Sequence, residues 1–251
     1  MKASAVLLPH ASKRLIARGV SVHPLVRSAM TEGTVVITLG TTNAYVADEL
    51  LGRTIDHGAF AAGVIDDRWN INARIAEAKE IVLRYGEAIE IGPEEPLASL
   101  GPHDVVIKGG NALDPYGAVG VLMASSSGGT VGRYVAPALA RGVSIVIPIS
   151  VGKSIHTSIA ELSLRMGSKR IDLSSGIPSG LYPLTGHVLS EIEALDLLFG
   201  VQAIHVASGG VGPGAGSVSL LLEGEEDAVR QAFAYVESLA GEEEPVVEGR
   251  K

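Results

Sequence analysis

The stretch Asp104–Arg133, DVVIKGGNALDPYGAVGVLMASSSGGTVGR, contains the strongest indications of fold and of site in this 251-residue chain. It opens with Val105-Val106-Ile107, and a run this short and rich in β-branched residues predicts a strand buried on both faces. The strand ends at Lys108-Gly109-Gly110-Asn111, where glycines permit backbone conformations and close approaches that a Cβ would forbid. We therefore expect a buried strand that ends in a tight turn carrying one lysine.

A second glycine group follows within the same stretch and leads into a helical pattern. A glycine- and hydroxyl-rich turn at a helix start presents free backbone N–H groups and a positive dipole end, which suits an anion such as phosphate. Lys108 adds a mobile charge nearby in sequence. Two interpretations stay open, an anion-binding site and two tight turns that serve packing alone. On the first, the ligand-binding candidates are Gly109, Gly110, Ser126, Ser127, Gly128, Gly129 and Thr130.

A third turn of this kind lies earlier in the chain. The strand pattern Thr34–Leu39 is followed by Gly40, Thr41, Thr42 and Asn43, and then by a helical run. The turn lacks the Lys-Ser or Lys-Thr of a P-loop, and simple helix capping is the alternative to ligand binding. If the strands at 34–39 and 105–107 lie parallel and adjacent, both turns open on one crevice beyond their carboxyl ends.

Composition and element order predict the fold class. Hydrophobic residues make up 46% and aromatic residues only 4%, a balance typical of a parallel α/β sheet. A helix over Thr130–Arg141 that joins the strand before it to a strand at Val143–Ile149 predicts a βαβ unit. We expect an α/β domain with a mostly parallel, doubly wound sheet over residues 1–174. The order strand-helix-strand-strand-helix-strand predicts a smaller α+β, ferredoxin-like (βαββαβ) domain over 175–251.

Several classes of function are disfavoured. The net charge of −8 and the lack of any basic block argue against a nucleic-acid partner. The absence of cysteine excludes disulfides, thiolate metal sites and a cysteine nucleophile, and the dispersed histidines predict no metal site and no cofactor. No apolar run reaches the roughly 18 residues of a membrane span, so we expect no membrane partner and a cytoplasmic location. Low aromatic content and modest domains predict a homo-oligomer.

Residues 33–155 resemble the sugar-phosphate isomerase and CoA-transferase superfamily, which includes ribose-5-phosphate isomerase, the sugar-sensing domains of DeoR-type repressors and methylthioribose-1-phosphate isomerase. Gly33–Thr42 is similar to the phosphate-holding strand and turn of the DeoR-type domains. Val106–Gly110 is similar to the Lys-Gly-Gly loop of ribose-5-phosphate isomerase, and Asp114–Gly117 to a segment of the repressor domains. The resemblance implies a small phosphorylated ligand.

Two functions are consistent with these features. As an isomerase-like enzyme, the protein would use Asp114 as the base, with Lys108 or Asn111 stabilising the enediolate oxygen. As a non-enzymatic sensor or assembly protein, it would bind the same kind of ligand in the same crevice without turnover. The catalytic sets of the resembling enzymes are incomplete in this chain, which favours the second. A stand-alone binder without an output domain would need a partner to report to, and for that reason we expect the enzyme.

Overall fold

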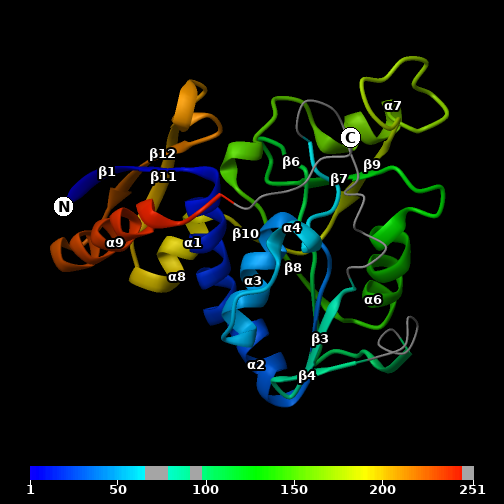
Figure 1. Cartoon of the computed structure of the whole chain (residues 1–251), viewed down its shortest axis with the longest axis horizontal. Coiled ribbons are helices and arrows are strands. Elements are labelled where there is room, and N and C mark those ends of the chain that lie inside the picture. The colour runs from blue at the N-terminus through cyan, green and yellow to red at the C-terminus, as the bar shows by residue number, and fades with distance from the viewer. Residues whose placement is uncertain (66–78, 91–97, 245–251) are drawn as a thin grey trace.

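The computed structural model describes residues 1–65, 79–90 and 98–244, and these form a mixed α/β structure (Figure 1). The helices are α1 (Pro9–Val22), α2 (Pro24–Glu32), α3 (Thr41–Leu51), α4 (His57–Phe60), α6 (Ala136–Ala140), α7 (Ile159–Arg165), α8 (Glu191–Phe199) and α9 (Glu226–Ser238). A π-helical segment, η2 (Val131–Val135), precedes α6, and short 3₁₀ turns lie at η3 (Val151–Lys153), η4 (Gly212–Gly214) and η5 (Leu239–Gly241). The strands are β1 (Lys2–Leu7), β2 (Thr34–Ile37), β3 (Ile81–Arg84), β4 (Glu87–Ile89), β5 (Val105–Ile107), β6 (Ala112–Leu113), β7 (Val119–Met123), β8 (Ser144–Pro148), β9 (Gly180–Leu184), β10 (His187–Leu189), β11 (Gln202–Ser208) and β12 (Val218–Glu223).

A six-stranded sheet with the order β10-β8-β5-β2-β3-β4 forms the centre of the molecule. The strands β10, β8, β5 and β2 pair in parallel, whereas β3 and β4 add antiparallel pairs at one side. The α/β class expected from the sequence is thus confirmed, with a sheet that is mixed. Because β2 and β5 are parallel neighbours, the turns that follow them lie at the same edge of the sheet, as the sequence predicted.

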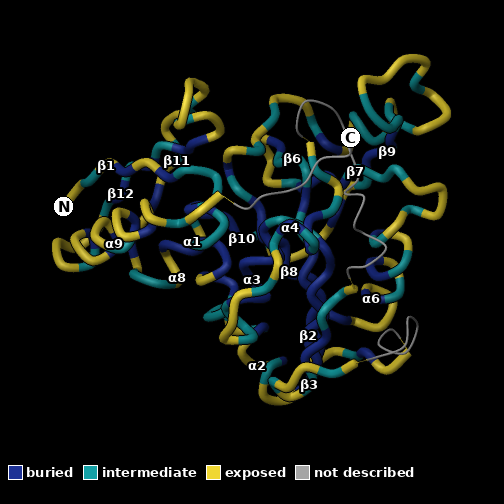
Figure 2. The backbone as a smooth tube through the Cα atoms, viewed as in Figure 1, coloured by how far each residue is buried: buried dark blue, intermediate teal, exposed yellow. Residues whose placement is uncertain are grey.

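Helices cover both faces of this sheet, which explains why its inner strands are uniformly apolar. Alternate residues of β2 point to opposite sides. Val35 and Ile37 pack in the same cluster as residues of α1 and α3. Val36, between them, packs with Tyr134 and Ala138 of the helical segment on the other side. Figure 2 shows the resulting column of buried strands.

A second sheet, β6-β7-β9, corrects the expected βαβ unit. The strand before the helical segment is β7, and it pairs antiparallel with β6 and β9 instead of joining β8. The parallel partner of β8 is β5, so the crossover that contains α6 starts at β5 and includes the β6–β7 excursion. The apolar pattern of β7 is satisfied by burial of Val119 and Val121 against isoleucines of β8.

The expected ferredoxin-like unit over 175–251 is wrong. Its four strands are expected at 181–184, 203–207, 218–222 and 246–247 and would have to share one sheet. The first of them lies in the β6-β7-β9 sheet, the next two lie in a different sheet, and 246–247 lies outside the described residues. β9 pairs with β7, β10 extends the central sheet beside β8, and β11 and β12 form a third sheet with β1 from the N-terminus. All three sheets therefore contain strands from both sides of residue 175. The physical reason is that open strand edges in the first part of the chain pair with strands of the second part, and element order alone does not reveal such partners.

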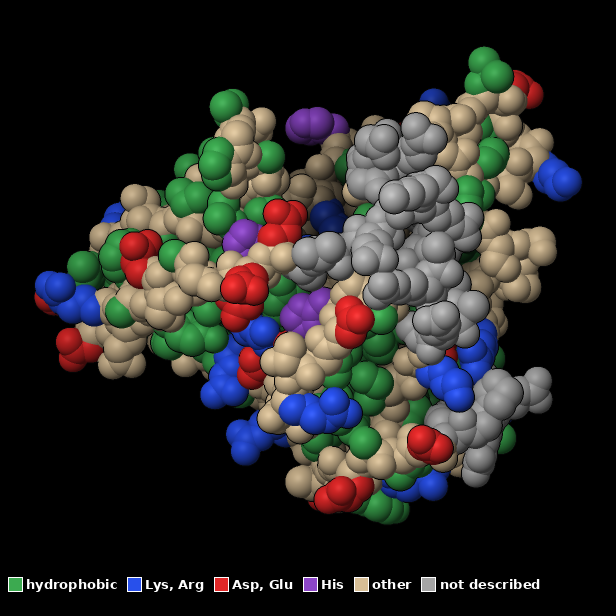
Figure 3. All heavy atoms as spheres, in the orientation of Figure 1, with side chains coloured by type: hydrophobic (Ala, Val, Ile, Leu, Met, Phe, Trp, Pro, Cys, Tyr) green, Lys and Arg blue, Asp and Glu red, His purple; other side chains and the backbone are tan. Residues whose placement is uncertain are grey.

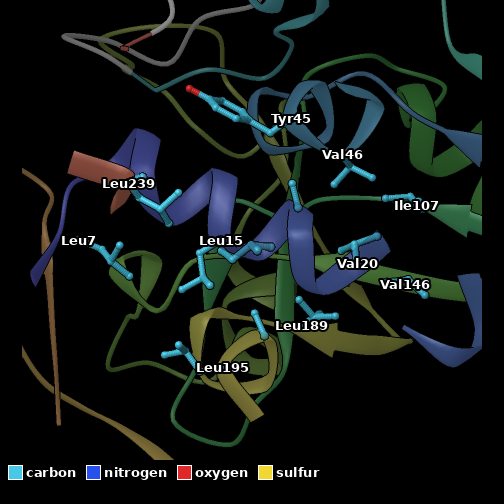
Figure 4. Packing of buried hydrophobic residues seen from close by; sticks show 14 of the residues in the cluster. Leu7, Leu15, Val20, Tyr45, Val46, Ile107, Val146, Leu189, Leu195 and Leu239 are labelled. Carbon is cyan, nitrogen blue, oxygen red and sulfur yellow. The ribbon is translucent and has the colours of Figure 1, made fainter. Parts of the chain in front are cut away.

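The main hydrophobic core joins the central sheet to the third sheet through α1. Figure 4 shows Leu15 and Val20 of α1 between Leu7 and Leu239 on one side and Ile107 and Val146 on the other. Leu189 and Leu195, from β10 and α8, pack into the same cluster. One continuous core thus fixes the carboxyl ends of β2, β5 and β8, where the candidate site lies. No helix within the described ranges is long and apolar enough to cross a membrane.

Candidate functional site

A cavity of about 190 Å³ lies where β5 ends in Lys108. Its walls are mainly apolar, and Leu39, which follows β2, contributes to them together with Val64, Val121, Met123 and Val131. Polar groups are few and come from Lys108, Asn111, Ser125, Thr130 and Ser179. An apolar cavity with a small number of convergent polar groups is typical of a small-molecule site, and its modest size suits a small metabolite.

Lys108 is the charged group in the described part of this lining. Its side chain is only 6% exposed, and its Nζ donates a hydrogen bond to the carbonyl oxygen of Gly109 at 3.1 Å. No carboxylate of the described residues lies within ion-pair distance of this Nζ. Burial lowers the pKa of Lys108 to about 8, and the nearby charge of Lys153 adds to that effect. An ammonium has three N–H donors, and among the described residues only one of those of Lys108 has a hydrogen-bond partner.

Lys153, in the turn η3 after β8, supplies a second ammonium near that of Lys108 but outside the described lining of the cavity. Its Nζ donates to the carbonyl oxygen of Gly110 at 2.7 Å, so the two lysines bond to consecutive carbonyls of one turn. Desolvation lowers the pKa of Lys153 to about 8, the charge of Lys13 adds to this effect, and Glu191 opposes it. Two neighbouring ammonium groups, each with a carbonyl partner, thus lie at this edge of the sheet.

Glu191, the first residue of α8, holds the turn that carries Lys153. Its carboxylate accepts hydrogen bonds from Ser150 Oγ at 2.5 Å and from the N–H of Val151 at 2.9 Å. Burial raises the pKa of Glu191, while the bonds from Ser150 and Val151 act in the opposite direction. The carboxylate of Glu191 therefore holds the turn at Ser150 and Val151 and forms no ion pair with Lys108.

The turn Gly40–Asn43 lies beside the Lys108 turn but does not line the cavity. Asn43 Nδ2 donates to the carbonyl oxygens of Thr38 at 2.8 Å and Ile107 at 3.3 Å, which ties the ends of β2 and β5 together. The N–H of Gly40 donates to the carbonyl oxygen of Phe60 instead of facing a ligand. None of the four predicted candidates in this turn lines the cavity, namely Gly40, Thr41, Thr42 and Asn43. The preceding residue, Leu39, does line it.

The serine- and glycine-rich loop does reach the cavity, although with a different residue set from the one predicted. Ser125, Gly128, Gly129 and Thr130 line it, whereas Ser127 faces an adjoining hollow of about 570 Å³. Gly128 and Gly129 have φ values of +80° and +56°, a left-handed region that favours glycine. The helical segment begins at Gly129, so its first N–H groups lack intrahelical acceptors. Of the predicted loop residues, Ser126 lines neither hollow.

The glycines of the Lys108 turn have structural roles. A Cβ on Gly110 would stand 2.2 Å from Val119 Cγ1, so this position must be glycine for β7 to pack against the turn. A Cβ on Gly109 would have ordinary contacts, the nearest being the carbonyl oxygen of Pro148 at 3.5 Å. Neither glycine lines the cavity, and both contribute through the carbonyl groups that hold the two lysines.

Asn111 lines the cavity and acts as a clamp on its wall. Its Nδ2 donates to the carbonyl oxygen of Gly63 at 3.0 Å, and its Oδ1 accepts from the N–H of Leu122 at 3.0 Å. The side chain thereby joins the loop before residue 66 to β7. This arrangement explains the residue type without requiring contact with a reacting atom.

Asp114 occupies a position that differs from the one expected of a base. It is absent from the described lining, and its carboxylate accepts hydrogen bonds from the N–H groups of Tyr116, Ala118 and Ile159 at 2.9–3.0 Å. Burial raises the pKa of Asp114, but these three backbone donors outweigh that effect and keep the pKa below its ordinary value. The ionised carboxylate of Asp114 therefore stabilises the turn at Tyr116 and Ala118 and the start of α7 at Ile159.

Sequence reasoning missed Lys153, Glu191 and the wall formed by residues 62–65. The signal for Lys153 was present in Val151-Gly152-Lys153-Ser154, which has the Lys-Ser of a P-loop but lacks its leading glycine. Only the parallel pairing of β8 with β5 brings that turn next to Lys108.

Within the described residues, no group of three or more histidine, aspartate or glutamate side chains is arranged to hold a metal ion. Comparisons with protein-family models, curated proteins and solved structures find no match for this chain.

Proposed function

We propose that this protein binds a small phosphorylated metabolite in the cavity at Lys108 and supports proton transfer on it, as an isomerase-like enzyme. The observation that carries the proposal is the Lys108 ammonium, which is buried in a largely apolar cavity beside a second ammonium and has a single carbonyl partner among the described residues. A buried charge without a counterion is costly. An anionic ligand would remove that cost and would gain a charge-assisted hydrogen bond.

The loop that includes Ser125, Gly129 and Thr130 supports a phosphate in particular. Two residues with hydroxyl groups and the start of a helical segment line the same cavity that contains Lys108. N–H groups at a helix start bind phosphate readily because they are unpaired and lie at the positive end of the helix dipole.

The group best placed for proton transfer is Lys108 itself. With a pKa of about 8, roughly a tenth of its side chain is neutral at pH 7, which is enough for an amine to act as a base. Asp114, the base expected from the sequence, has no part in this scheme because its oxygens hold backbone N–H groups.

The binding test is calorimetry with sugar phosphates, the matching sugars without phosphate, and inorganic phosphate. Lys108→Ala should weaken binding of a phosphorylated ligand by about 1.5–3 kcal/mol, the worth of a hydrogen bond to a charged group. Lys2→Ala is the matched control, since Lys2 is exposed on β1 and pairs with Glu223. Equal affinity of wild type and Lys108→Ala for every phosphorylated ligand would contradict the proposal.

One observation favours the alternative of a non-enzymatic sensor with the same ligand. Apart from Lys108, the described lining contains no lysine, histidine, aspartate or glutamate that could exchange a proton. Proton NMR in D₂O separates the two functions. An enzyme should exchange the hydrogen next to the ligand's carbonyl for deuterium, and a sensor should bind the ligand and leave that hydrogen in place.

The predicted homo-oligomer remains part of the proposal. On the face shown in Figure 3, acidic and basic side chains are interspersed, and apolar side chains gather over β1 and the β11–β12 hairpin. Val6 of β1, Ile204 and Val206 of β11, and Val211 between β11 and β12 are exposed. Light scattering that gives a mass near the 25.9 kDa of one chain at micromolar concentration would rule out self-association.

A further inference from the structure

We propose that Lys108 is a nucleophile that forms an imine with the carbonyl carbon of the ligand, so that the substrate class is a small aldehyde or ketone bearing an anionic group. The inference rests on the proposed function in using the same cavity. It goes further in assigning a covalent step to the lysine and a functional group to the ligand.

The first step of the argument is the position of the amine. Lys108 follows directly on β5, an inner strand whose neighbours β2 and β8 are both parallel to it. Val105, Val106 and Ile107 are buried, so the backbone that carries the lysine is held rigidly. The side chain lines the cavity and is 6% exposed, which places the amine against a ligand and away from bulk water.

The second step is the set of charged groups around the amine. The charge that acts on Lys108 is that of Lys153, which in turn feels Lys13 and Glu191. A carboxylate beside Lys108 would hold its proton, but Glu191 is bound to Ser150 and Val151 on the side of Lys153. A lysine that only binds an anion needs no second cation to disfavour its proton. A lysine that must supply a lone pair does, because a desolvated amine beside another cation is activated as a nucleophile.

The third step is the chemistry. The neutral amine nitrogen of Lys108 adds to the carbonyl carbon, a C–N bond forms, and the carbonyl oxygen takes up a proton to give a carbinolamine. Loss of that oxygen as water breaks the C–O bond and leaves a protonated imine. In balance, the neutral amine, the carbonyl compound and one proton give the protonated imine and water, with no oxidant or reductant. The cationic nitrogen then withdraws electrons from the adjacent C–H bond and makes it more acidic. With its nitrogen bonded to carbon, Lys108 has this activating role in place of the role of base.

The wall of the cavity suits this step. Thr130 and Ser125 place hydroxyl groups in the lining, where they could pass a proton to the departing oxygen. The apolar remainder, which includes Val121 and Met123, keeps bulk water from hydrolysing the imine.

The test is reductive trapping. The protein is incubated with sodium cyanoborohydride and, in separate arms, dihydroxyacetone phosphate and dihydroxyacetone, and modified lysines are located by peptide mass spectrometry. Lys108 should be trapped at least about tenfold faster than the exposed Lys2 and Lys169, because its lowered pKa gives it far more neutral amine at neutral pH. Lys153→Met should shift the pH midpoint of trapping upwards by removing the neighbouring charge.

The matched variant is Lys108→Arg, which keeps the positive charge and cannot form an imine. It should retain phosphate binding and lose trapping at position 108. Should this variant fail to fold, the relative trapping rates of the lysines in the wild-type protein decide the question alone.

The outcomes separate the two proposals. Trapping confined to exposed lysines, with phosphate binding intact, overturns the imine and leaves the proposed function standing. Trapping at Lys108 that proceeds equally with the unphosphorylated ketone, with no phosphate binding, supports the imine and overturns the phosphorylated ligand. Neither trapping at Lys108 nor phosphate binding overturns both.

Discussion

Two sets of buried or half-buried charged side chains lie in this molecule, and they are organised in opposite ways. In the first, between α1, α3 and α4, Arg14 donates to Asp48 at 3.0 Å, to Glu49 at 3.2 Å and to Glu242 at 2.8 Å. His57 lies 2.7 Å from the same Asp48 carboxylate. In the second, at the ends of β5 and β8, Lys108 and Lys153 bond only to backbone carbonyls of one turn among the described residues.

The difference separates charged side chains that stabilise the fold through ion pairs from those that are free to bind a ligand. Each of the three guanidinium nitrogens of Arg14 donates to a carboxylate, so its charge is neutralised within the fold and the cluster ties α1, α3 and the segment at Glu242 together. Two ammonium groups with no carboxylate of the described residues at ion-pair distance leave the folded protein with an unfavourable charge that a ligand can neutralise. Both sets are buried or half-buried. The candidate site differs in that its lysines have no carboxylate of the described residues as an ion-pair partner.

The largest effect should follow from breaking the paired set. Asp48→Ala leaves Arg14 and His57 without their shared acceptor and removes the acceptor of the Ile55 N–H. We expect a loss of about 3–4 kcal/mol in the free energy of unfolding, as for a broken buried ion pair. Urea denaturation followed by circular dichroism measures it, with Asp172→Ala, an exposed carboxylate, as control. A loss no greater than that of the control would show that pairing contributes little here.

The buried lysine of the second set, Lys108, should make the free energy of unfolding depend on pH. The folded-state pKa of Lys108 is about 8, below the 10.5 of an unfolded lysine. Between these values the unfolded chain binds more protons, so stability rises with pH through that window and the penalty is full below about pH 8. Wild type should gain about 2–3 kcal/mol from Lys108 between pH 8 and pH 10, and Lys108→Met should lack that share.

Denaturation at several pH values measures this rise. A wild type and a Lys108→Met variant with parallel stability curves over the window would contradict the lowered pKa and, with it, the unpaired charge.

A smaller effect is expected at Asp114, whose carboxylate is engaged although it is not part of a cation pair. Asp114→Asn removes the charge and part of the acceptor capacity used by Tyr116, Ala118 and Ile159. It should cost about 1–2 kcal/mol of stability and leave ligand affinity unchanged. Asp172→Asn is the conservative control at an exposed site. Loss of turnover at unchanged stability would instead restore Asp114 as a base.

The smallest effect on stability is expected for an ion pair whose two side chains are exposed to solvent. Arg230 and Glu226 form an exposed pair one helical turn apart on α9. Arg230→Ala should change stability by about 0.3–0.5 kcal/mol at most, since solvent screens the attraction. A loss comparable with that of Asp48→Ala would show that burial is irrelevant to the contrast between the two sets.

The elements that depend on local pattern follow from the amino-acid sequence alone. The β-branched runs of β2, β5 and β8 predict buried inner strands because only a strand covered on both faces can be apolar at every position. The glycine turns after β2 and β5 follow from the same reasoning, and parallel pairing then places them at one edge. Lys108 and the Gly128–Thr130 turn, which local sequence singles out, both line the candidate cavity.

Features that depend on partners distant in the chain were settled by the tertiary fold. The pairing of β12 with β1 and of β9 with β7 overturns the expected ferredoxin-like unit, because backbone groups pair with whichever strand edge lies open. Asp114 changed from base to turn acceptor because Ile159, 45 positions away, donates to it. The role of Lys153 follows from its hydrogen bond to the carbonyl of Gly110. A lysine's pKa and its charged neighbours depend on the surrounding fold and not on the adjacent residues in sequence.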